Sequence, residues 1–153
     1  ELDSQGYLKI TDRKKDLIVL SNGKNVAPLT IESALVGDDF VAQTMVIGNN
    51  RNFVSAIIIP DFERLKRYAA DQGIDAADNN ELVNNEKIKA LFRHRIDGLM
   101  KDFARFEQIK QFVLLPDEFT EASGELTPTL KIKRKVVEKK FAKEIEELYL
   151  KTA

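Results

Sequence analysis

Short, strongly apolar runs separated by polar turns predict the strands of this protein. Residues 41–48 and 53–60 are two such runs, joined by the polar segment Asn49-Asn-Arg-Asn52, and this spacing predicts an antiparallel hairpin. Residues 53–60 are nearly all apolar, which is typical of a strand buried on both faces, so we expect this strand at the centre of a sheet. A third apolar run, residues 109–115, predicts a third core strand.

Apolar residues at helical spacing predict about four helices, over residues 28–37, 61–73, 79–103 and 137–149. The first begins with a proline, which suits the first helical turn, and is followed by a glycine. An aspartate at the start of the second and asparagines at the start of the third can cap their free N–H groups. The third segment has the most regular apolar face, and we expect it to form the longest helix.

The first twenty-odd residues predict a small hairpin. Residues 6–11 and 17–20 are β-rich runs on either side of the charged turn Asp12-Arg-Lys-Lys-Asp16. The following Asn22-Gly23 pair is typical of a tight turn in which both residues have positive φ. Together these elements indicate an α+β fold: a small, largely antiparallel sheet of about three core strands plus an N-terminal hairpin, covered by about four helices.

Composition limits the classes of function. The chain has 153 residues, a net charge of −1 and no cysteine. This length suits one domain, and the near-neutral charge gives no global field for nucleic acid, so we expect no nucleic-acid partner. The lack of cysteine excludes disulfides and thiolate metal sites and fits a reducing compartment such as the cytoplasm. The chain opens Glu-Leu-Asp-Ser, without an initiator methionine, and we expect it to be part of a longer protein.

The most informative residue is Lys131, in the run Leu126-Thr-Pro-Thr-Leu-Lys-Ile-Lys-Arg134. Six of the ten residues 131–140 are Lys or Arg. Such a run is usually the solvated start of a helix. Cations at a helix N-terminus oppose the macrodipole, however, and an anion bound there would relieve that conflict.

Other side chains give weaker signals. His94 is the only histidine, and its setting in Phe92-Arg-His-Arg95 predicts a surface residue on the polar side of the long helix. With one histidine and no cysteine we expect no metal site. The aromatic residues lie mostly at core spacing, which favours packing over base stacking. No glycine-rich phosphate loop is present.

Two segments together resemble a known family. The stretch from Gly6 to Pro28, followed by Ile31-Glu32, resembles the junction between the large and small domains of acyl-adenylate-forming enzymes. The segment Gly124-Glu-Leu-Thr-Pro-Thr-Leu-Lys-Ile-Lys-Arg-Lys135 resembles the part of the small domain that carries the adenylation lysine. Its Leu-Thr-Pro-Thr-Leu-Lys form is similar to the long-chain fatty acyl-CoA synthetases, and so is Ala56-Ile-Ile-Ile-Pro-Asp61.

The resemblance implies roles for residues at matching positions. Arg13 matches the arginine that holds the ribose hydroxyls of the adenylate. Lys15 matches the hinge about which the small domain rotates. Lys131 matches the lysine that bridges the fatty carboxylate and the α-phosphate of ATP. Lys133 and Arg134 are further candidate contacts for CoA or ATP phosphates.

The resemblance also implies a second site and a division of the chain. A loop that matches the wall of the pantetheine channel comprises Ser21, Asn22, Gly23, Lys24 and Asn25. Many relatives have Gly-Gly where this chain has Asn-Gly, and the asparagine side chain could narrow the channel. Residues 1–15 are then a hinge and hairpin region, and residues 16–153 a mobile C-terminal lid.

The sequence therefore predicts the C-terminal domain of a long-chain fatty acid–CoA ligase. ATP and CoA would be substrates, and Mg²⁺ would be carried with ATP by an N-terminal domain, which would also supply the acyl tunnel. We expect this part alone to be inactive and the complete cytoplasmic enzyme to be able to associate with a membrane surface. Alternatives are an adenylating ligase for another carboxylic acid and a non-catalytic module that binds anions through residues 131–140.

Overall fold

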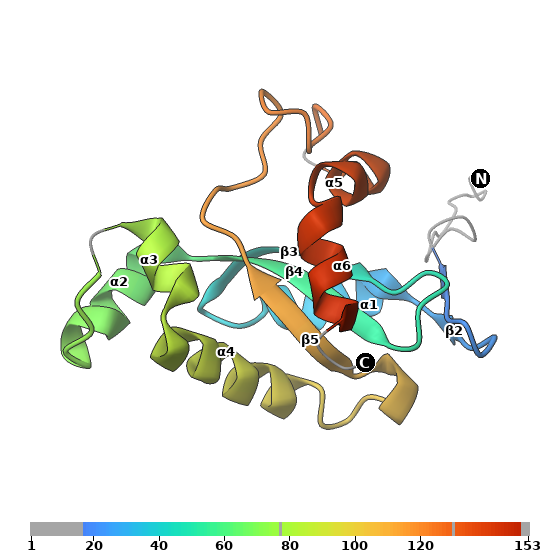
Figure 1. Ribbon diagram of the computed structural model, residues 1–153, viewed down its shortest axis with the longest axis horizontal. Coiled ribbons are helices and arrows are strands. Elements are labelled where there is room, and N and C mark those ends of the chain that lie inside the picture. The colour runs from blue at the N-terminus through green and yellow to red at the C-terminus, as the bar shows by residue number, and fades with distance from the viewer. Residues whose placement is uncertain (1–16, 77, 130, 151–153) are drawn as a thin grey trace, which may run out of the picture.

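The computed structural model describes residues 17–76, 78–129 and 131–150. Figure 1 shows helices packed around a small sheet. The strands and α-helices, in chain order, are β1 (Ile18–Val19), β2 (Asn25–Val26), α1 (Pro28–Val36), β3 (Val41–Ile47), β4 (Val54–Pro60), α2 (Phe62–Asp71), α3 (Asn79–Asn84), α4 (Glu86–Leu99), β5 (Ile109–Leu114), α5 (Arg134–Lys140) and α6 (Ala142–Leu150). The α+β class predicted from sequence is confirmed.

The main sheet has the strand order β3–β4–β5. β3 and β4 form the predicted antiparallel hairpin, with Met45 opposite Ile57. Every residue of β4 is buried, which confirms that this strand is central. β5 pairs with β4 in parallel, a direction that the sequence did not predict. The connection through α2, α3 and α4 allows it, because a parallel pair needs a long crossover.

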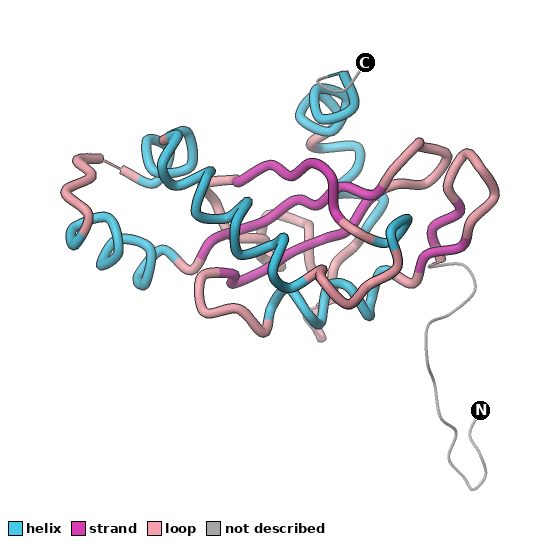
Figure 2. The backbone as a smooth tube through the Cα atoms, turned by 90° about the horizontal axis from the view of Figure 1, so that it is seen from below, coloured by secondary structure: helices cyan, strands magenta, loops and turns pink. Residues whose placement is uncertain are grey.

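Two apolar cores lie on opposite faces of this sheet. Successive side chains of β4 alternate between them, with Ala56 and Ile58 in one core and Ile57 and Ile59 in the other. The first core also contains residues of α1, α2, α3 and α4, and Figure 2 shows α4 lying across that face. The second core contains residues of α5, α6 and the loop that follows β5. The loop and α5 are therefore anchored on the same face.

Two of the predicted helices are each divided. Asn85 ends α3 and caps α4, because its Oδ1 accepts from the N–H groups of Lys87 (2.8 Å) and Ile88 (3.2 Å). Phe141 separates α5 from α6, with φ −109° and ψ 27°. The described residues therefore contain six α-helices instead of about four. None of these helices combines the length and apolarity needed to cross a membrane.

The described part of the N-terminal region is a short hairpin of β1 and β2. Residues 6–11 lie outside the described residues, and β1 pairs with β2 across the turn at Ser21–Gly23. Only Gly23 in this turn has a positive φ, 87°; Asn22 does not. The Asn22 side chain instead accepts a hydrogen bond from the Lys24 N–H (3.0 Å), so the turn forms without a left-handed asparagine.

Candidate functional site

Lys131 lies on the second arm of a small hairpin whose arms are residues 125–129 and 131–133. Leu126 and Ile132 form a β-bridge. Thr127 N–H donates to Lys131 O (2.8 Å), and Lys131 N–H donates to Thr127 Oγ1 (3.0 Å). Lys133 N–H donates to Glu125 O (2.7 Å) and completes the ladder. Both the N–H and the C=O of Lys131 are thus hydrogen-bonded to Thr127, although Lys131 is exposed.

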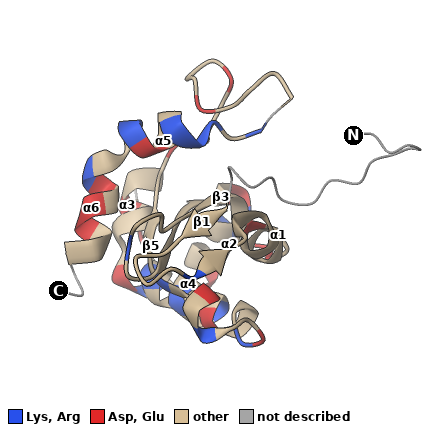
Figure 3. Cartoon of the chain, turned by 90° about the vertical axis from the view of Figure 1, so that its right-hand side faces the viewer, with Lys and Arg blue, Asp and Glu red and all other residues tan. Residues whose placement is uncertain are grey.

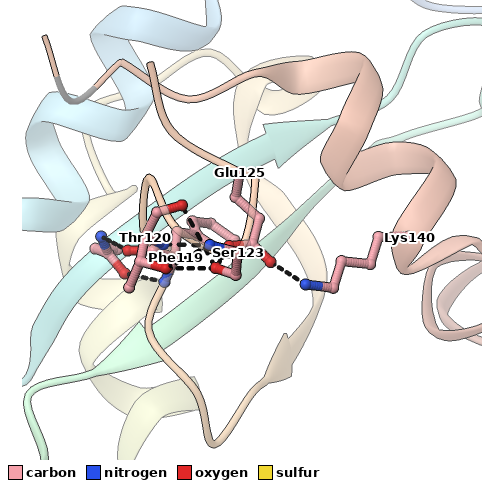
Figure 4. A network of polar contacts seen from close by, with 6 residues as sticks. Phe119, Thr120, Ser123, Glu125 and Lys140 are labelled. Carbon is pink, nitrogen blue, oxygen red and sulfur yellow. Dashed lines mark hydrogen bonds and ion pairs between the residues drawn. The ribbon is translucent and has the colours of Figure 1, made fainter. Parts of the chain in front are cut away.

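The first arm of this hairpin is anchored by the Glu125 carboxylate (Figure 4). Glu125 is only 2% exposed. Its Oε1 accepts from the Thr120 N–H (3.1 Å) and the Ser123 hydroxyl, and its Oε2 accepts from the Lys140 ammonium of α5. Burial raises the pKa of Glu125, but the hydrogen bonds from Lys140, Ser123 and Thr120 lower it more, so the pKa lies below its ordinary value. Glu125 is therefore a buried carboxylate, and both of its oxygens accept hydrogen bonds.

Arg134, a candidate phosphate contact, is paired with an acid in the structure. Its guanidinium forms a bidentate ion pair with the Glu32 carboxylate of α1, at 2.7 Å and 2.9 Å. Glu32 Oε2 also accepts from the Val46 N–H of β3 (2.7 Å). Arg134 is therefore committed to a structural tether in this conformation. Lys133, one residue earlier, is exposed, and its ammonium pairs with no acid among the described residues.

The five residues predicted to line a pantetheine channel are exposed, and the first four lie in the loop between β1 and β2. The loop is docked on the β3–β4 turn, since Ser21 N–H donates to Arg51 O (2.9 Å) and Ser21 Oγ lies 3.4 Å from Asn52 Oδ1. Lys24 Nζ lies 5.3 Å from the centroid of the Phe106 ring. Asn25 is the first residue of β2. Backbone and side-chain contacts thus hold this loop against the β3–β4 turn, and Lys24 lies over the Phe106 ring.

The structure does not bring all the predicted residues together. In Figure 1 the loop that leads to Lys131 projects at the top of the view, whereas the β1–β2 hairpin lies at the right. Arg13 and Lys15 lie outside the described residues. A cavity of about 220 Å³ between the β3–β4 turn and α6 is lined by Arg51, Glu146 and Tyr149, and by none of the predicted site residues. The two candidate segments therefore occupy different parts of one domain surface.

The remaining sequence candidates are His94 and the aromatic residues. His94 is exposed on α4, as predicted. Phe92 is fully buried, and Phe103, Phe106 and Phe141 are partly buried against the two cores, which confirms their assignment to packing. Within residues 17–76, 78–129 and 131–150, no three His, Cys, Asp or Glu side chains are placed to hold a metal ion.

Charge is uneven over the helices near Lys131. Lys and Arg lie mainly on α5, whereas Glu residues lie mainly on α6 (Figure 3). Sequence reasoning identified the cations of this region but missed their acidic partners, Glu125 and Glu32. The signal for Glu32 was an acid between two core residues of α1, Ile31 and Leu35, both fully buried. An acid at such a position needs a partner.

Comparison with known proteins decides the family. The sequence model of the AMP-binding enzyme C-terminal domain matches residues 15–153, which is most of the chain. The chain belongs to this family. The assignment made from the segments around Lys15 and Lys131 is thereby confirmed.

Relatives of this AMP-binding enzyme C-terminal domain include named ligases. It is 39% identical to the long-chain-fatty-acid–CoA ligase FadD15 of Mycobacterium tuberculosis, over 98% of this chain and 25% of the relative. It is 37% identical to long-chain-fatty-acid–CoA ligase 6 of Mus musculus, over 95% of this chain and 21% of the relative. The chain thus spans a quarter or less of the length of these relatives.

A solved structure of the same shape is the A domain of carboxylic acid reductase from Segniliparus rugosus, in complex with AMP and a co-purified carboxylic acid. The TM-score is 0.76 at 25% identity, and the match covers 93% of this chain and 21% of that one. The AMP-binding enzyme C-terminal domain described here therefore has the fold of the corresponding part of an adenylating enzyme.

Proposed function

We propose that this chain is the mobile C-terminal domain of a long-chain fatty acid–CoA ligase. The complete enzyme converts a fatty acid and ATP to acyl-AMP and pyrophosphate, then transfers the acyl group to CoA and releases AMP. Similarity to two named long-chain-fatty-acid–CoA ligases over nearly the whole chain supports this substrate class. Mg²⁺ enters with ATP and is held by the N-terminal domain.

The proposal rests on the exposure of Lys131 and on the absence of an acidic partner for its ammonium among the described residues. The residue is exposed, its backbone is fixed by Thr127, and its ammonium pairs with no acid in the described part of the chain. A fatty carboxylate and the α-phosphate of ATP are both anionic and repel each other. An unpaired ammonium between them lowers that repulsion and stabilises the charge that develops during adenylation.

The second half-reaction uses the other segment. Residues 21–25 line the pantetheine channel after the domain rotates about Lys15, and Arg13 binds the ribose hydroxyls of the adenylate. Lys133 is the better candidate for a phosphate contact, because Arg134 is already paired with Glu32. The separation of the Lys131 hairpin from the β1–β2 loop supports alternation, since each segment can face the active site in turn.

A second candidate is an adenylating enzyme for another carboxylic acid. This candidate is supported by the similarity in fold to the A domain of a carboxylic acid reductase. A panel of acids of different chain length and ring content, assayed with the complete enzyme, separates the two. Preference for long-chain fatty acids supports the first candidate.

The proposal is tested with Lys131→Ala in the complete enzyme, with the half-reactions assayed separately. We expect fatty-acid-dependent pyrophosphate exchange to fall by about 10²–10³-fold, while thioester formation from supplied acyl-adenylate is kept. Lys135→Ala, which removes an exposed cation four residues later, is the matched control and should leave both rates unchanged. Survival of both half-reactions in Lys131→Ala would refute the role of this lysine.

A further inference from the structure

The position of Lys131 depends on the residue at the root of its hairpin. The Lys131 side chain is exposed and packs into neither core. Among the described residues its backbone bonds to Thr127 alone, and the ladder ends at the bond from Lys133 N–H to Glu125 O. Any displacement of Glu125 is therefore transmitted along two short arms to Lys131.

Glu125 is joined to α5, the helix that continues the second arm. The second arm runs from Lys131 directly into α5, which begins at Arg134. The Glu125 carboxylate, on the first arm, accepts from Lys140, the last residue of that helix. The ion pair thus connects the first arm to the continuation of the second and adds to the backbone hydrogen bonds that hold the two arms together.

α5 itself is fixed without this pair. Arg134 is held by Glu32 at one end of the helix, and Val137 is fully buried in the core beside α6. Lys140 reaches Glu125 from the surface, with 45% of its side chain exposed. Loss of the Lys140 ammonium should consequently leave the helix in place and loosen the first arm, which is then held by Thr120, Ser123 and the buried Leu126.

We propose that the Glu125–Lys140 ion pair is a positioning device that holds Lys131 in the geometry required for adenylation. This inference rests on the proposed function of Lys131. Lys140 and Glu125 are positioning residues: they act through the hairpin backbone and contact no substrate. Alignment of reacting groups contributes strongly to rate, and a displacement of about 1 Å can cost about 10²-fold.

The test is Lys140→Met in the complete enzyme, beside Lys140→Arg, which keeps a cation able to reach Glu125, and Lys139→Met, which removes the exposed neighbouring cation. We expect Lys140→Met to lower kcat of pyrophosphate exchange about tenfold. KM for ATP should stay within about twofold, because the ammonium touches no phosphate, and thioester formation from supplied acyl-adenylate should be unchanged. Lys140→Arg should recover most of the rate, and Lys139→Met should match the unmodified enzyme.

Three results would overturn the inference. The first is an unchanged exchange rate in Lys140→Met while Lys131→Ala loses it, which would leave the proposed function intact. The second is an equal loss in both half-reactions together with a lower melting temperature, which indicates a purely structural pair. The third is a raised KM for ATP at unchanged kcat, which indicates direct phosphate binding. Glu125→Gln should reproduce the selective loss, whereas an unaffected Lys131→Ala would reject the proposed function itself.

Discussion

Glu32 and Arg134, separated by 102 residues, form a bidentate ion pair beside the β3 edge of the main sheet. β3 is an edge strand, and the outward N–H of Val46 donates to Glu32 Oε2 at 2.7 Å. One acid of α1 therefore binds both a strand edge and the first residue of α5. Because the Glu32 and Arg134 side chains are only 11% and 22% exposed, solvent screens the pair weakly.

Removing one partner of this pair should destabilise the domain. Arg134→Met leaves the Glu32 carboxylate nearly buried without its cation, and we expect a loss of about 3 kcal/mol in the free energy of unfolding. Urea denaturation of the 153-residue chain measures it. The control is Arg64→Met, because Arg64 is 55% exposed and lies 3.6 Å from its acidic partners; its loss should be below about 0.5 kcal/mol. Equal losses in the two variants would contradict the tether.

The sequence could not reveal this tether. Charge and spacing identified Arg134 as a cation near Lys131, but its partner lies on a helix more than a hundred residues away. Which acid a cation meets depends on tertiary packing. By contrast, β4 was predictable, because a nearly all-apolar run of this length is typical of a strand buried on both faces.

Asn85 explains why the apolar periodicity predicted one helix where the structure has two, α3 and α4. Its side chain accepts from two N–H groups of α4 and so starts a new helix inside the apolar pattern. We expect Asn85→Ala to lower the free energy of unfolding by about 1 kcal/mol. The neighbouring Asn84→Ala is the control: that side chain donates only to Asn80 O within α3. Thermal unfolding of both variants checks the difference, and a neutral Asn85→Ala would argue for one continuous helix.

The lowered pKa of Glu125 predicts a dependence of stability on pH. Burial raises the pKa of Glu125, but the hydrogen bonds from Lys140, Ser123 and Thr120 hold it below its ordinary value in the folded state. The carboxylate thus contributes its full stabilisation above the ordinary pKa of a glutamate, and this is lost as the pH falls through the lower folded pKa. The difference in unfolding free energy between the unmodified chain and Glu125→Gln should shrink from pH 7 to pH 3. A difference that stays constant with pH would show that the charge of Glu125 is not involved.

Recognition of the candidate site came from resemblance and not from composition. Lys131 alone is one cation in a basic run, and only its combination with the segment around Lys15 indicated adenylation. The Glu125–Lys140 pair escaped detection because an acid in a polar loop is usually solvated. Burial of Glu125 depends on the core beneath it, where Leu126 and Phe119 pack.

Asn22 provides a test of the thioester half-reaction. Its Oδ1 accepts from the Lys24 N–H at 3.0 Å and shapes the loop without requiring a positive φ at Asn22. If residues 21–25 line the pantetheine channel, Asn22→Ala should slow acyl transfer to CoA by about tenfold, because the loop is less well aligned. Asn22→Ser keeps a side-chain acceptor and should retain most of the rate.

The same variants separate this role from a general effect on the domain. Adenylation should be unchanged in Asn22→Ala, because the loop lies apart from the Lys131 hairpin (Figure 1). Ser33→Ala, an exposed position on α1, should alter neither half-reaction. The assay follows CoA-dependent release of AMP from supplied acyl-adenylate, beside pyrophosphate exchange. An equal fall in both rates would mean that the loop supports the domain as a whole and does not act in the CoA step.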